Sequence, residues 1–267
     1  MSTRVLITGA ASGIGAATAA ELRRRGVQVA GLDLIADEGA AIHAADVTDQ
    51  ESVDAAVAVA VERLGGLDVL INCAGIGDPQ SAGRRPGADA LRVIDVNLLG
   101  PWRVTGAAIE ALQESRGRVV NVASGLAHLT IPFATAYCMS KRGLVAYSDA
   151  LRLEYGDEVT VTTVYPGYIR TPIHDAAGLL GISLEGAVPE ERLFDAVGAL
   201  VRATLGPPVR DLATTRQGAV GYALLKLAPR RLIDRIAHRR MRASARQGHM
   251  DGSELAAGLR QRLLRSG

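Results

Sequence analysis

The feature that most constrains the fold of this chain is the alternation of short β-branched runs with long alanine-rich segments of helical period. Such alternation is typical of βαβ units wound around a parallel sheet. We expect strands at residues 4–8, 28–33, 69–72, 118–123 and 159–164, and helices at 13–25, 49–64, 89–112, 135–155 and 190–205. The predicted fold class is α/β, a doubly wound parallel sheet with helices on both faces.

Composition fits a single domain that covers residues 1–267, because no linker rich in Pro, Ser or Gly divides the chain. Hydrophobic residues make up 48% of the 267 residues and charged residues 22%, so the chain can bury a full core. The formal charge of +2 gives no indication of a nucleic-acid partner. The residues Thr48 to Glu51 have the form of a capping box at the start of the second helix.

The expected location is the cytoplasm. The two cysteines, Cys73 and Cys138, provide no disulfide framework and fit a reducing compartment. No apolar run has the roughly 18 residues that a membrane span needs. The apolar run at 5–7 leads into a glycine motif and not into a cleavage site, so we predict no signal peptide.

A glycine-rich run, TGAASGIG at residues 8–15, follows the first expected strand. Glycine permits a tight turn close to a pyrophosphate, and the next helix start offers free N–H groups and a positive dipole end. Asp33 ends the second strand, where a carboxylate binds ribose hydroxyls and repels a 2′-phosphate. The pattern favours NAD over NADP, although the arginines at 23–25 leave binding of that phosphate as an alternative.

Tyr137 and Lys141 are four residues apart in the expected helix 135–155, and Ser124 precedes Tyr137 by thirteen residues. Side chains at i and i+4 lie on one helix face. A cation about 4 Å away favours a phenolate by roughly three pKa units, so we expect Lys141 to bring the pKa of Tyr137 to about 7. Ser124 is expected beside the phenol, on the same substrate oxygen. The Tyr-Lys spacing alone also occurs on ordinary helices.

Together these motifs resemble the short-chain dehydrogenase/reductase family, in that family's order and over about the first 190 residues. The run at 8–15 is similar to its Thr-Gly-x-x-x-Gly-x-Gly loop. Residues 72–75 are similar to its Asn-Asn-Ala-Gly strand end, with Cys73 in place of the second Asn. The run that begins at Pro166 resembles its Pro-Gly loop. The resemblance implies a Rossmann-type sheet of about seven strands, with cofactor binding and catalysis in residues 1–190.

The resemblance also implies the roles of individual residues. Ser124 would polarise the substrate C–O group and Tyr137 would exchange its proton. Lys141 would lower the phenol pKa and bind the nicotinamide ribose, while Asn97 would kink a helix and hold a relay water. The implied cofactor-binding residues are Gly9, Ser12, Gly13, Ile14, Gly15, Asp33, Asp46, Val47, Asn72, Ala74, Gly75, Tyr137, Lys141, Pro166, Gly167, Ile169 and Thr171. No metal ligands are expected.

The implied reaction interconverts a secondary alcohol and a ketone by hydride transfer to or from NAD(H), with oxidation as the favoured direction. Two alternatives stay open, an NADPH-dependent ketone reductase and a nucleotide-binding sensor or scaffold without turnover. Segments 76–88 and 173–188 lack periodicity and are expected to be loops, the second one a substrate loop. The substrate is a small molecule, and the apolar stretch at 218–229 weakly indicates a lipophilic one.

The C-terminal extension, about residues 218–267, departs from the resemblance because it has no Asp-Gly-Gly tail. Arginines crowd residues 230–242 and leave one apolar stripe. The stripe consists of Leu232, Ile233, Ile236, Ala237 and Met241. Such a helix can lie on an anionic membrane surface, cover the cleft or pack on a partner subunit, and we favour packing over the membrane. By resemblance we expect a homodimer or homotetramer that pairs through helices 135–155 and 190–205.

Overall fold

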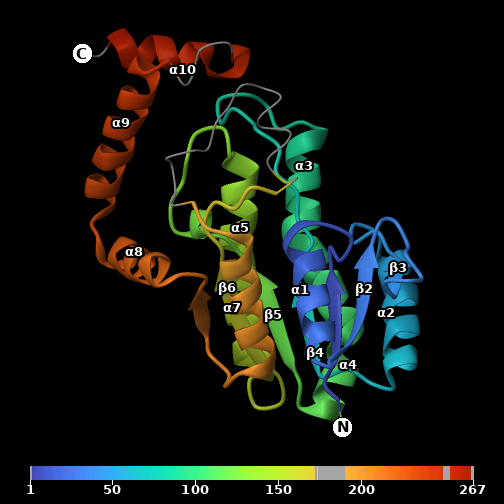
Figure 1. The fold of residues 1–267 in the computed structure, drawn as a ribbon. Helices are drawn as coiled ribbons and strands as arrows, with labels where there is room; N and C mark the ends of the chain where they lie inside the picture. The colour runs from blue at the N-terminus through green and yellow to red at the C-terminus, as the bar shows by residue number, and fades with distance from the viewer. Residues whose placement is uncertain (1, 172, 174–189, 249–252, 266–267) are drawn as a thin grey trace.

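A parallel sheet of seven strands forms the centre of the molecule (Figure 1). The structure is a computed structural model that describes residues 2–171, 173, 190–248 and 253–265. The strand order is β3-β2-β1-β4-β5-β6-β7. The strands are β1 (Arg4–Thr8), β2 (Gln28–Asp33), β3 (Ile42–Ala44), β4 (Val69–Asn72), β5 (Arg118–Val122), β6 (Thr160–Tyr165) and β7 (Asp211–Ala213). The predicted α/β class and doubly wound sheet are therefore confirmed.

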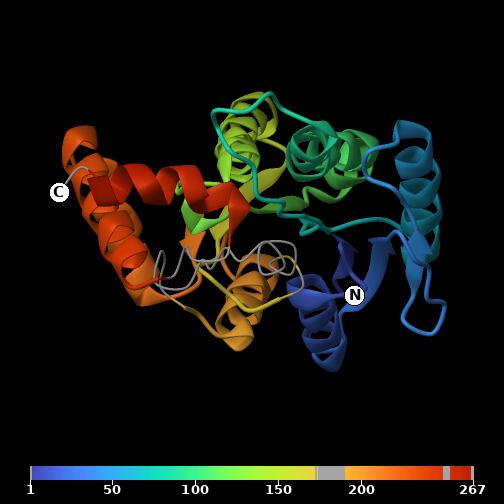
Figure 2. The ribbon, with the colours of Figure 1, turned by 90° about the horizontal axis from the view of Figure 1, so that it is seen from above.

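Helices cover both faces of the sheet (Figure 2). The helices are α1 (Gly13–Arg24), α2 (Gln50–Leu64), α3 (Ala88–Ile94), α4 (Gly100–Ser115), α5 (Thr135–Tyr155), α7 (Leu193–Leu205), α8 (Arg216–Leu227), α9 (Arg230–Arg246) and α10 (Glu254–Arg265). Helices α1 and α7 pack together on one face, and α2, α4 and α5 cover the other. This arrangement places two layers of helices around the strands.

Each face of the sheet has its own hydrophobic core. In β1, Val5 and Ile7 belong to the core under α1 and α7, whereas Leu6 belongs to the core under α2 and α4. All three side chains are fully buried. Successive side chains of a strand point to opposite faces, so a strand buried on both sides is apolar throughout. The apolar runs recognised in the sequence are this kind of strand.

The strand order reverses between β1 and β4, because the chain continues from β1 through β2 and β3 on one side and from β4 to β7 on the other. Ligands of open α/β sheets bind at such a switch point, outside the carboxyl ends of the strands. The two strand ends are tied together by Thr8, whose Oγ1 accepts the N–H groups of Cys73 and Ala74, each at 3.0 Å. This tie fixes the floor of the candidate site.

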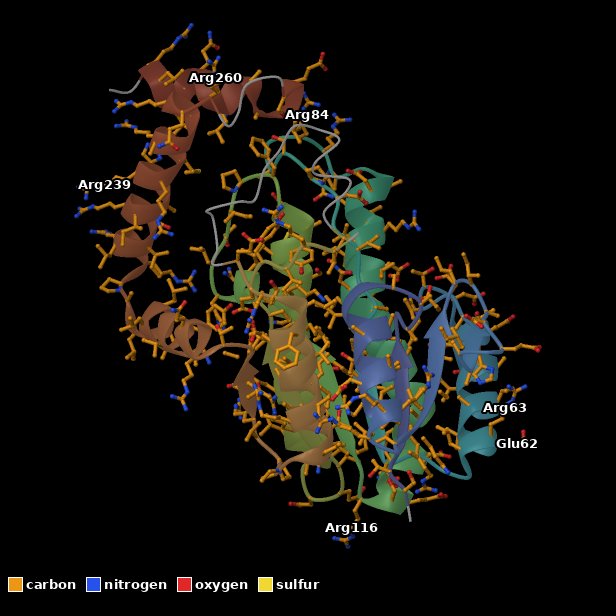
Figure 3. The ribbon with its side chains drawn as sticks, viewed as in Figure 1. Glu62, Arg63, Arg84, Arg116, Arg239 and Arg260 are labelled. Carbon is orange, nitrogen blue, oxygen red and sulfur yellow. The ribbon has the colours of Figure 1, made fainter. Side chains whose placement is uncertain are left out.

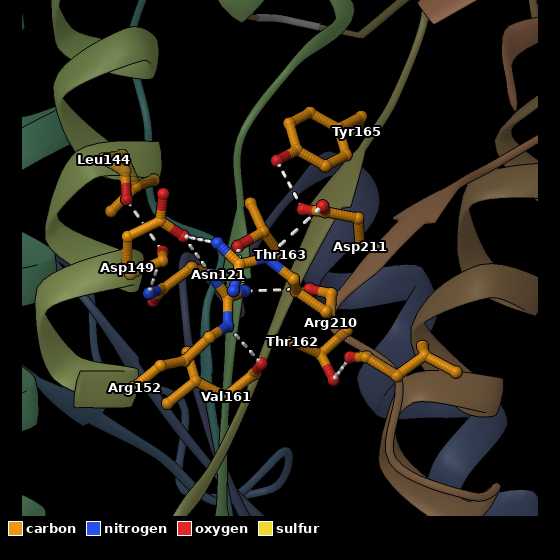
Figure 4. A network of polar contacts seen from close by, with 12 residues as sticks. Asn121, Leu144, Asp149, Arg152, Val161, Thr162, Thr163, Tyr165, Arg210 and Asp211 are labelled. Carbon is orange, nitrogen blue, oxygen red and sulfur yellow. Dashed lines mark hydrogen bonds and ion pairs between the residues drawn. The ribbon is translucent and has the colours of Figure 1, made fainter. Parts of the chain in front are cut away.

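A network of arginines and carboxylates attaches α5 to β6 and to the start of β7 (Figure 4). Arg152 contacts Asp149 at 2.6 Å and donates hydrogen bonds to the Val161 carbonyl at 2.9 Å and to Thr163 Oγ1 at 2.7 Å. Arg210 contacts the same Asp149 carboxylate at 2.7 Å. The helix that carries the candidate tyrosine and lysine is thus fixed against the sheet.

The helix expected at 89–112 is interrupted. It consists of α3, a π-helical turn at Asp95–Leu99 and α4. The interruption occurs where the Asn97 side chain binds the backbone of Ile76, which distorts the regular helix. The kink that the resemblance implied at Asn97 is this π-helical turn.

Three further expectations need correction. Strands β3 and β7 were not located, because three residues are too few for a periodic pattern. The cap of α2 is Asp49 and not Thr48, since the Asp49 carboxylate accepts the Glu51 N–H at 3.0 Å. The helix expected at 190–205 begins only at residue 193, because the backbone N–H of Glu191 donates to Tyr168 at 2.7 Å instead.

Helices α9 and α10, together called the C-terminal arm, lie beside and above the sheet and its covering helices in Figure 1, whereas α10 overlaps the central elements when the molecule is seen from above (Figure 2). They pack on each other, whereas α8 packs on β7. Residues 216–267 hold twelve Lys and Arg against three Asp and Glu, so this segment carries a net charge of +9 and the rest of the chain −7. Arg239 of α9 projects away from the molecule (Figure 3). Among the described residues, no helix is long and apolar enough to span a membrane.

Candidate active site

A pocket opens at the carboxyl edge of the sheet, next to the switch point. The glycine loop, the candidate serine, tyrosine and lysine, and the Pro-Gly loop all reach it. Its expected residues are Gly9, Ser12, Gly13, Ile14, Gly15, Ala74, Gly75, Ser124, Tyr137, Lys141, Pro166, Gly167, Ile169 and Thr171. The expected substrate loop at 173–188 lies outside the described residues except for Ile173, which also lines the pocket.

The glycine loop forms a cradle that only glycine permits. Gly9 has a φ of 70°, and its N–H donates to the Leu32 carbonyl at 2.9 Å. A Cβ on Gly15 would lie 2.0 Å from the Gly9 carbonyl oxygen, so any side chain there would displace the loop. Ser12 precedes α1 without capping it through its side chain. The first N–H groups of a helix have no partner within it, so the loop and α1 fit the pyrophosphate of a dinucleotide.

Asp33 lies at the end of β2, beside this loop. Its Oδ2 accepts the Ala11 N–H at 2.9 Å, and its Oδ1 accepts the Leu34 N–H at 2.8 Å. Each carboxylate oxygen has two acceptor sites, so the group retains capacity for ribose hydroxyls. The side chain does not line the described pocket, and its bond to the Ala11 N–H holds it against the glycine loop.

The arginines at 23–25, which were the alternative binding groups for a 2′-phosphate, contact other groups of the protein. Arg23 donates to the carbonyls of Val29 and Ala40, at 3.1 and 2.6 Å. Arg24 and Arg25 contact the Glu21 carboxylate at 2.8 and 2.7 Å. None of these contacts directs a guanidinium toward the place where a 2′-phosphate would meet Asp33.

Tyr137 and Ser124 meet at the inner end of the pocket. A hydrogen bond joins their side chains, and Ser124 Oγ also accepts the Leu126 N–H at 3.2 Å. Ser124 caps a short helical turn after β5, while Tyr137 is in the first turn of α5. Two hydroxyls that contact each other can both reach one substrate oxygen, which is the arrangement that general acid–base chemistry on a C–O group requires.

Lys141 reaches the same pocket but does not contact the phenol oxygen. Its Nζ donates to the Val122 carbonyl at 2.9 Å and lies 5.8 Å from the centroid of the Tyr137 ring. Burial lowers the pKa of Lys141 to about 8. Burial raises the pKa of Tyr137 to about 12, although the Ser124 hydrogen bond acts in the opposite direction. The expectation that Lys141 brings the phenol pKa to about 7 is wrong for this structure, because desolvation of the phenolate dominates.

Asn97 is fully buried in the π-helical turn. Its Oδ1 accepts the Ile76 N–H at 2.8 Å, and its Nδ2 donates to the Ile76 carbonyl at 2.9 Å and to Ser140 Oγ at 3.2 Å. The amide therefore fixes the chain just after Gly75, and it does not line the pocket. The relay role of Asn97 stays a prediction.

Besides Asp33, three of the expected cofactor residues do not line the pocket. Asn72 is buried in the core, where its amide donates to Thr105 Oγ1 at 3.0 Å and Asn121 Oδ1 at 2.9 Å, so it joins β4 to α4 and β5. Asp46 accepts both the N–H and the hydroxyl of Thr48, and these bonds lower its pKa. Val47 is buried next to Gly100. The described contacts of Asn72, Asp46 and Val47 are thus with other residues of the fold and not with groups that line the pocket.

The Pro-Gly loop closes the other side of the pocket. Ile169 is buried, and the Thr171 side chain faces Gly13, where an added Cβ would lie 3.7 Å from it. The glycine loop and the Pro-Gly loop therefore approach each other across the pocket mouth.

Sequence reasoning missed the residues behind this loop. Glu191 is buried and binds the Gly167 N–H at 2.8 Å. Tyr222 of α8 packs on Gly125, next to Ser124. Glu191 falls in the first turn of the helix expected at 190–205, and only its buried environment distinguishes it. The described residues contain no group of three or more His, Cys, Asp or Glu side chains suited to hold a metal ion.

Comparison with known proteins gives consistent matches. A family model described as short chain dehydrogenase matches residues 3–178. D-beta-hydroxybutyrate dehydrogenase of Rhizobium meliloti (strain 1021) is 30% identical over 215 residues, which are 72% of this chain and 83% of that protein. D-threitol dehydrogenase of Mycolicibacterium smegmatis is 33% identical over 204 residues, 70% and 78% of the two chains. The solved 3-ketoacyl-(acyl-carrier-protein) reductase from Brucella melitensis, complexed with NADH, aligns with a TM-score of 0.68 at 25% identity over 79% of this chain and 96% of that one.

Proposed function

Because the chain belongs to the short-chain dehydrogenase family, we propose that it oxidises a secondary alcohol to a ketone with NAD, and reduces the ketone with NADH in the reverse direction. The observation that carries the proposal is the convergence of Ser124, Tyr137 and Lys141 on the pocket that also holds the glycine loop. An acid–base pair and a dinucleotide cradle in one pocket are what hydride transfer to or from a C–OH carbon needs.

Each residue of the site has a separate role in binding or proton transfer. When bound, NAD supplies a hydride acceptor with a positive charge on its oxidised ring. The glycine loop and α1 hold the pyrophosphate, and Asp33 holds the adenosine ribose. Ser124 donates a hydrogen bond to the substrate oxygen, and the Tyr137 phenolate accepts the hydroxyl hydrogen and takes this proton as the carbon loses its hydride; in the reverse direction the Tyr137 phenol returns the proton. Lys141 contributes positive charge and a donor near the nicotinamide end, where Ile169 and Thr171 line the pocket.

The first test is the substitution Tyr137→Phe. It removes the proton acceptor and keeps the ring, so we expect alcohol oxidation to fall by about 10²–10⁴ in kcat. Turnover is measured by the absorbance of NADH with a panel of secondary alcohols. Binding of NADH, measured by fluorescence titration, should remain within a factor of about two of wild type, because the substitution leaves the cradle intact. Near-normal kcat in this variant would contradict the role of the phenol.

The apolar wall of the pocket supports a lipophilic substrate. Leu126, Ile131 and Phe133 line the side next to Tyr137. Phe133 has a φ of 63°, an uncommon conformation for a bulky residue, and its carbonyl accepts the Gln80 N–H at 2.8 Å.

The same alcohol panel separates the two alternative functions, a ketone reductase and a sensor or scaffold. A ketone reductase would turn over faster with NADPH and ketones, and a sensor or scaffold would bind the cofactor without any turnover.

Cofactor choice is tested by the substitution Asp33→Ala. Loss of the carboxylate removes the ribose contact and the repulsion of a 2′-phosphate, so KM for NAD should rise and activity with NADP should appear. The matched control is Asp37→Ala, which removes a nearby exposed carboxylate and should leave both KM values unchanged. The proposal fails if wild-type protein already prefers NADP, or if the control shifts preference as much as Asp33→Ala does.

We also propose that the protein is a cytoplasmic homodimer or homotetramer. Large apolar side chains are exposed on α5 and its neighbour α4, notably Leu153, Met139 and Trp102. Phe194 of α7 is 76% exposed. Exposed apolar residues gathered on helices support pairing with a second copy. Both cysteines are free, in keeping with a reducing compartment.

A further inference from the structure

We propose that Glu191 is a positioning residue for the cofactor, and that α8 belongs to the scaffold of the active site. The proposal rests on the proposed role of the Pro-Gly loop in holding the nicotinamide end of NAD. Its basis is a buried carboxylate that joins this loop to the end of β7 and the start of α8. No motif in the sequence indicated this connection.

The Glu191 carboxylate has three donors. Its Oε2 accepts the Gly167 N–H at 2.8 Å and also the Thr214 hydroxyl, and its Oε1 accepts the Thr215 hydroxyl at 2.7 Å. The residue is only 7% exposed. A buried charge needs such partners, and hydrogen bonds to a charged group are stronger than those between neutral groups. The carboxylate therefore holds these three segments in one arrangement.

The loop is held from both sides. On the inner side, the Pro166 carbonyl accepts the Gly125 N–H at 2.8 Å, directly after Ser124. On the outer side, Gly167 donates to the Glu191 carboxylate, and the Tyr168 carbonyl accepts the Glu191 N–H at 2.7 Å. Three consecutive residues are thus fixed just before Ile169 and Thr171, which line the pocket. Loss of the Glu191 carboxylate would free the Gly167 N–H and leave the two backbone contacts of Pro166 and Tyr168 in place.

The same carboxylate organises the start of α8. Thr215 is the N-cap of this helix, and its Oγ1 accepts the Gly218 N–H at 3.0 Å while its hydroxyl donates to Glu191. A Cβ on Gly218 would lie 3.3 Å from Glu191 Oε1, so the helix start fits closely on the carboxylate. The helix cannot shift without breaking the bond on which the loop depends.

A second contact brings α8 to the catalytic turn. The Tyr222 ring lies so close to Gly125 that a Cβ added there would be 2.3 Å from the Tyr222 hydroxyl. The ring also packs on His128 and Tyr165, with centroids 5.2 and 6.2 Å apart. A side chain at position 125 would therefore displace the Tyr222 ring. Through Glu191 and Tyr222, α8 supports both the Pro-Gly loop and the serine turn.

The test compares three variants of the full chain. Glu191→Ala removes both acceptor oxygens and leaves the Gly167 N–H unpaired. Glu191→Gln keeps one acceptor oxygen and the side-chain volume. Thr162→Val is the matched control, because it removes a buried hydrogen bond from β6 to the Val209 carbonyl, at 2.6 Å, away from the Pro-Gly loop. Each variant is measured for NADH affinity, for KM with NAD, for kcat and for thermal unfolding.

We expect Glu191→Ala to weaken NADH binding and raise KM for NAD by about tenfold or more, with a smaller effect in Glu191→Gln. Thr162→Val should lower the unfolding temperature without changing either constant. The inference is overturned if Glu191→Ala and Glu191→Gln bind NADH as wild type does, or if Thr162→Val weakens binding equally at a similar loss of stability. If wild-type protein binds neither NADH nor NADPH, the proposed function itself fails, which is a different outcome.

Discussion

At the scale of single residues, the site contains a lysine that the fold makes costly to charge. Lys141 is 4% exposed, and its ammonium has the Val122 carbonyl as a hydrogen-bond partner. Burial disfavours the charged form, which is why its pKa falls to about 8 from 10.5. A positive charge in this position weakens the fold at neutral pH. We therefore expect the Lys141 charge to serve the reaction, in which it stabilises negative charge on the phenol and substrate oxygens.

This lysine makes stability depend on pH. Because the folded pKa of about 8 lies below the unfolded value of 10.5, the unfolded chain binds more protons between these values, and stability rises with pH across that window. We expect the difference in unfolding free energy between wild type and Lys141→Met to shift in favour of wild type by on the order of 3 kcal/mol from pH 7 to pH 10.5. Denaturant titrations at several pH values measure this difference.

The other lysine in the chain, Lys226, is the control for this experiment. Its side chain is 51% exposed and lies 3.6 Å from Asp211. Lys226→Met should follow the wild-type pH dependence, because an exposed ammonium has little desolvation to lose. A difference between wild type and Lys141→Met that stays flat between pH 7 and pH 10.5 would show that the buried lysine keeps its ordinary pKa.

At the scale of elements, the sequence predicted those strands and helices whose position depends on a local hydrophobic pattern. Strands β1, β2 and β4 have the expected bounds, since each is a short, mostly apolar run that is buried on both faces of the sheet. The three-residue strands β3 and β7 form only because a neighbouring strand pairs with them, which no local pattern encodes. The π-helical turn likewise depends on a contact between Asn97 and Ile76, 21 residues apart.

The residues of the site also divide into those set by local spacing and those set by contacts distant in sequence. The glycine loop, Ser124, Tyr137 and Lys141 were predictable because their chemistry depends on spacing along a strand end or a helix. The pKa of Tyr137 was not, because burial depends on the whole fold, and Lys141 turns to the Val122 carbonyl. Glu191 was not predictable either, since Gly167 and Thr215, which it joins, are each 24 residues away in sequence.

At the scale of the whole molecule, charge is divided between two parts. The segment 216–267 is strongly basic, and the remainder is acidic. On α9 the apolar side chains Leu232 and Ile236 are 48% and 45% exposed. In a single copy this stripe is only partly covered, and the acidic remainder of a second copy would provide both apolar contact and opposite charge.

We therefore expect the C-terminal arm to strengthen self-association. A chain that ends at Pro229 should sediment as a smaller species than the full chain at the same concentration, and the difference should shrink at high salt. The control is incubation of both forms with vesicles of mixed phosphatidylcholine and phosphatidylserine, in which both should stay in the supernatant. Pelleting of the full chain alone with the vesicles would show instead that the arm binds an anionic bilayer.

The position of α8 against the serine turn sets a boundary for protein engineering. A truncation or graft that begins after Pro229 spares Thr215 and Tyr222, and with them every contact that α8 makes to the pocket loops. One that begins at Arg216 would remove Tyr222, which packs on Gly125 next to Ser124. Residues from α9 onward can therefore be exchanged between proteins, whereas α8 should be kept together with the core in any chimaera.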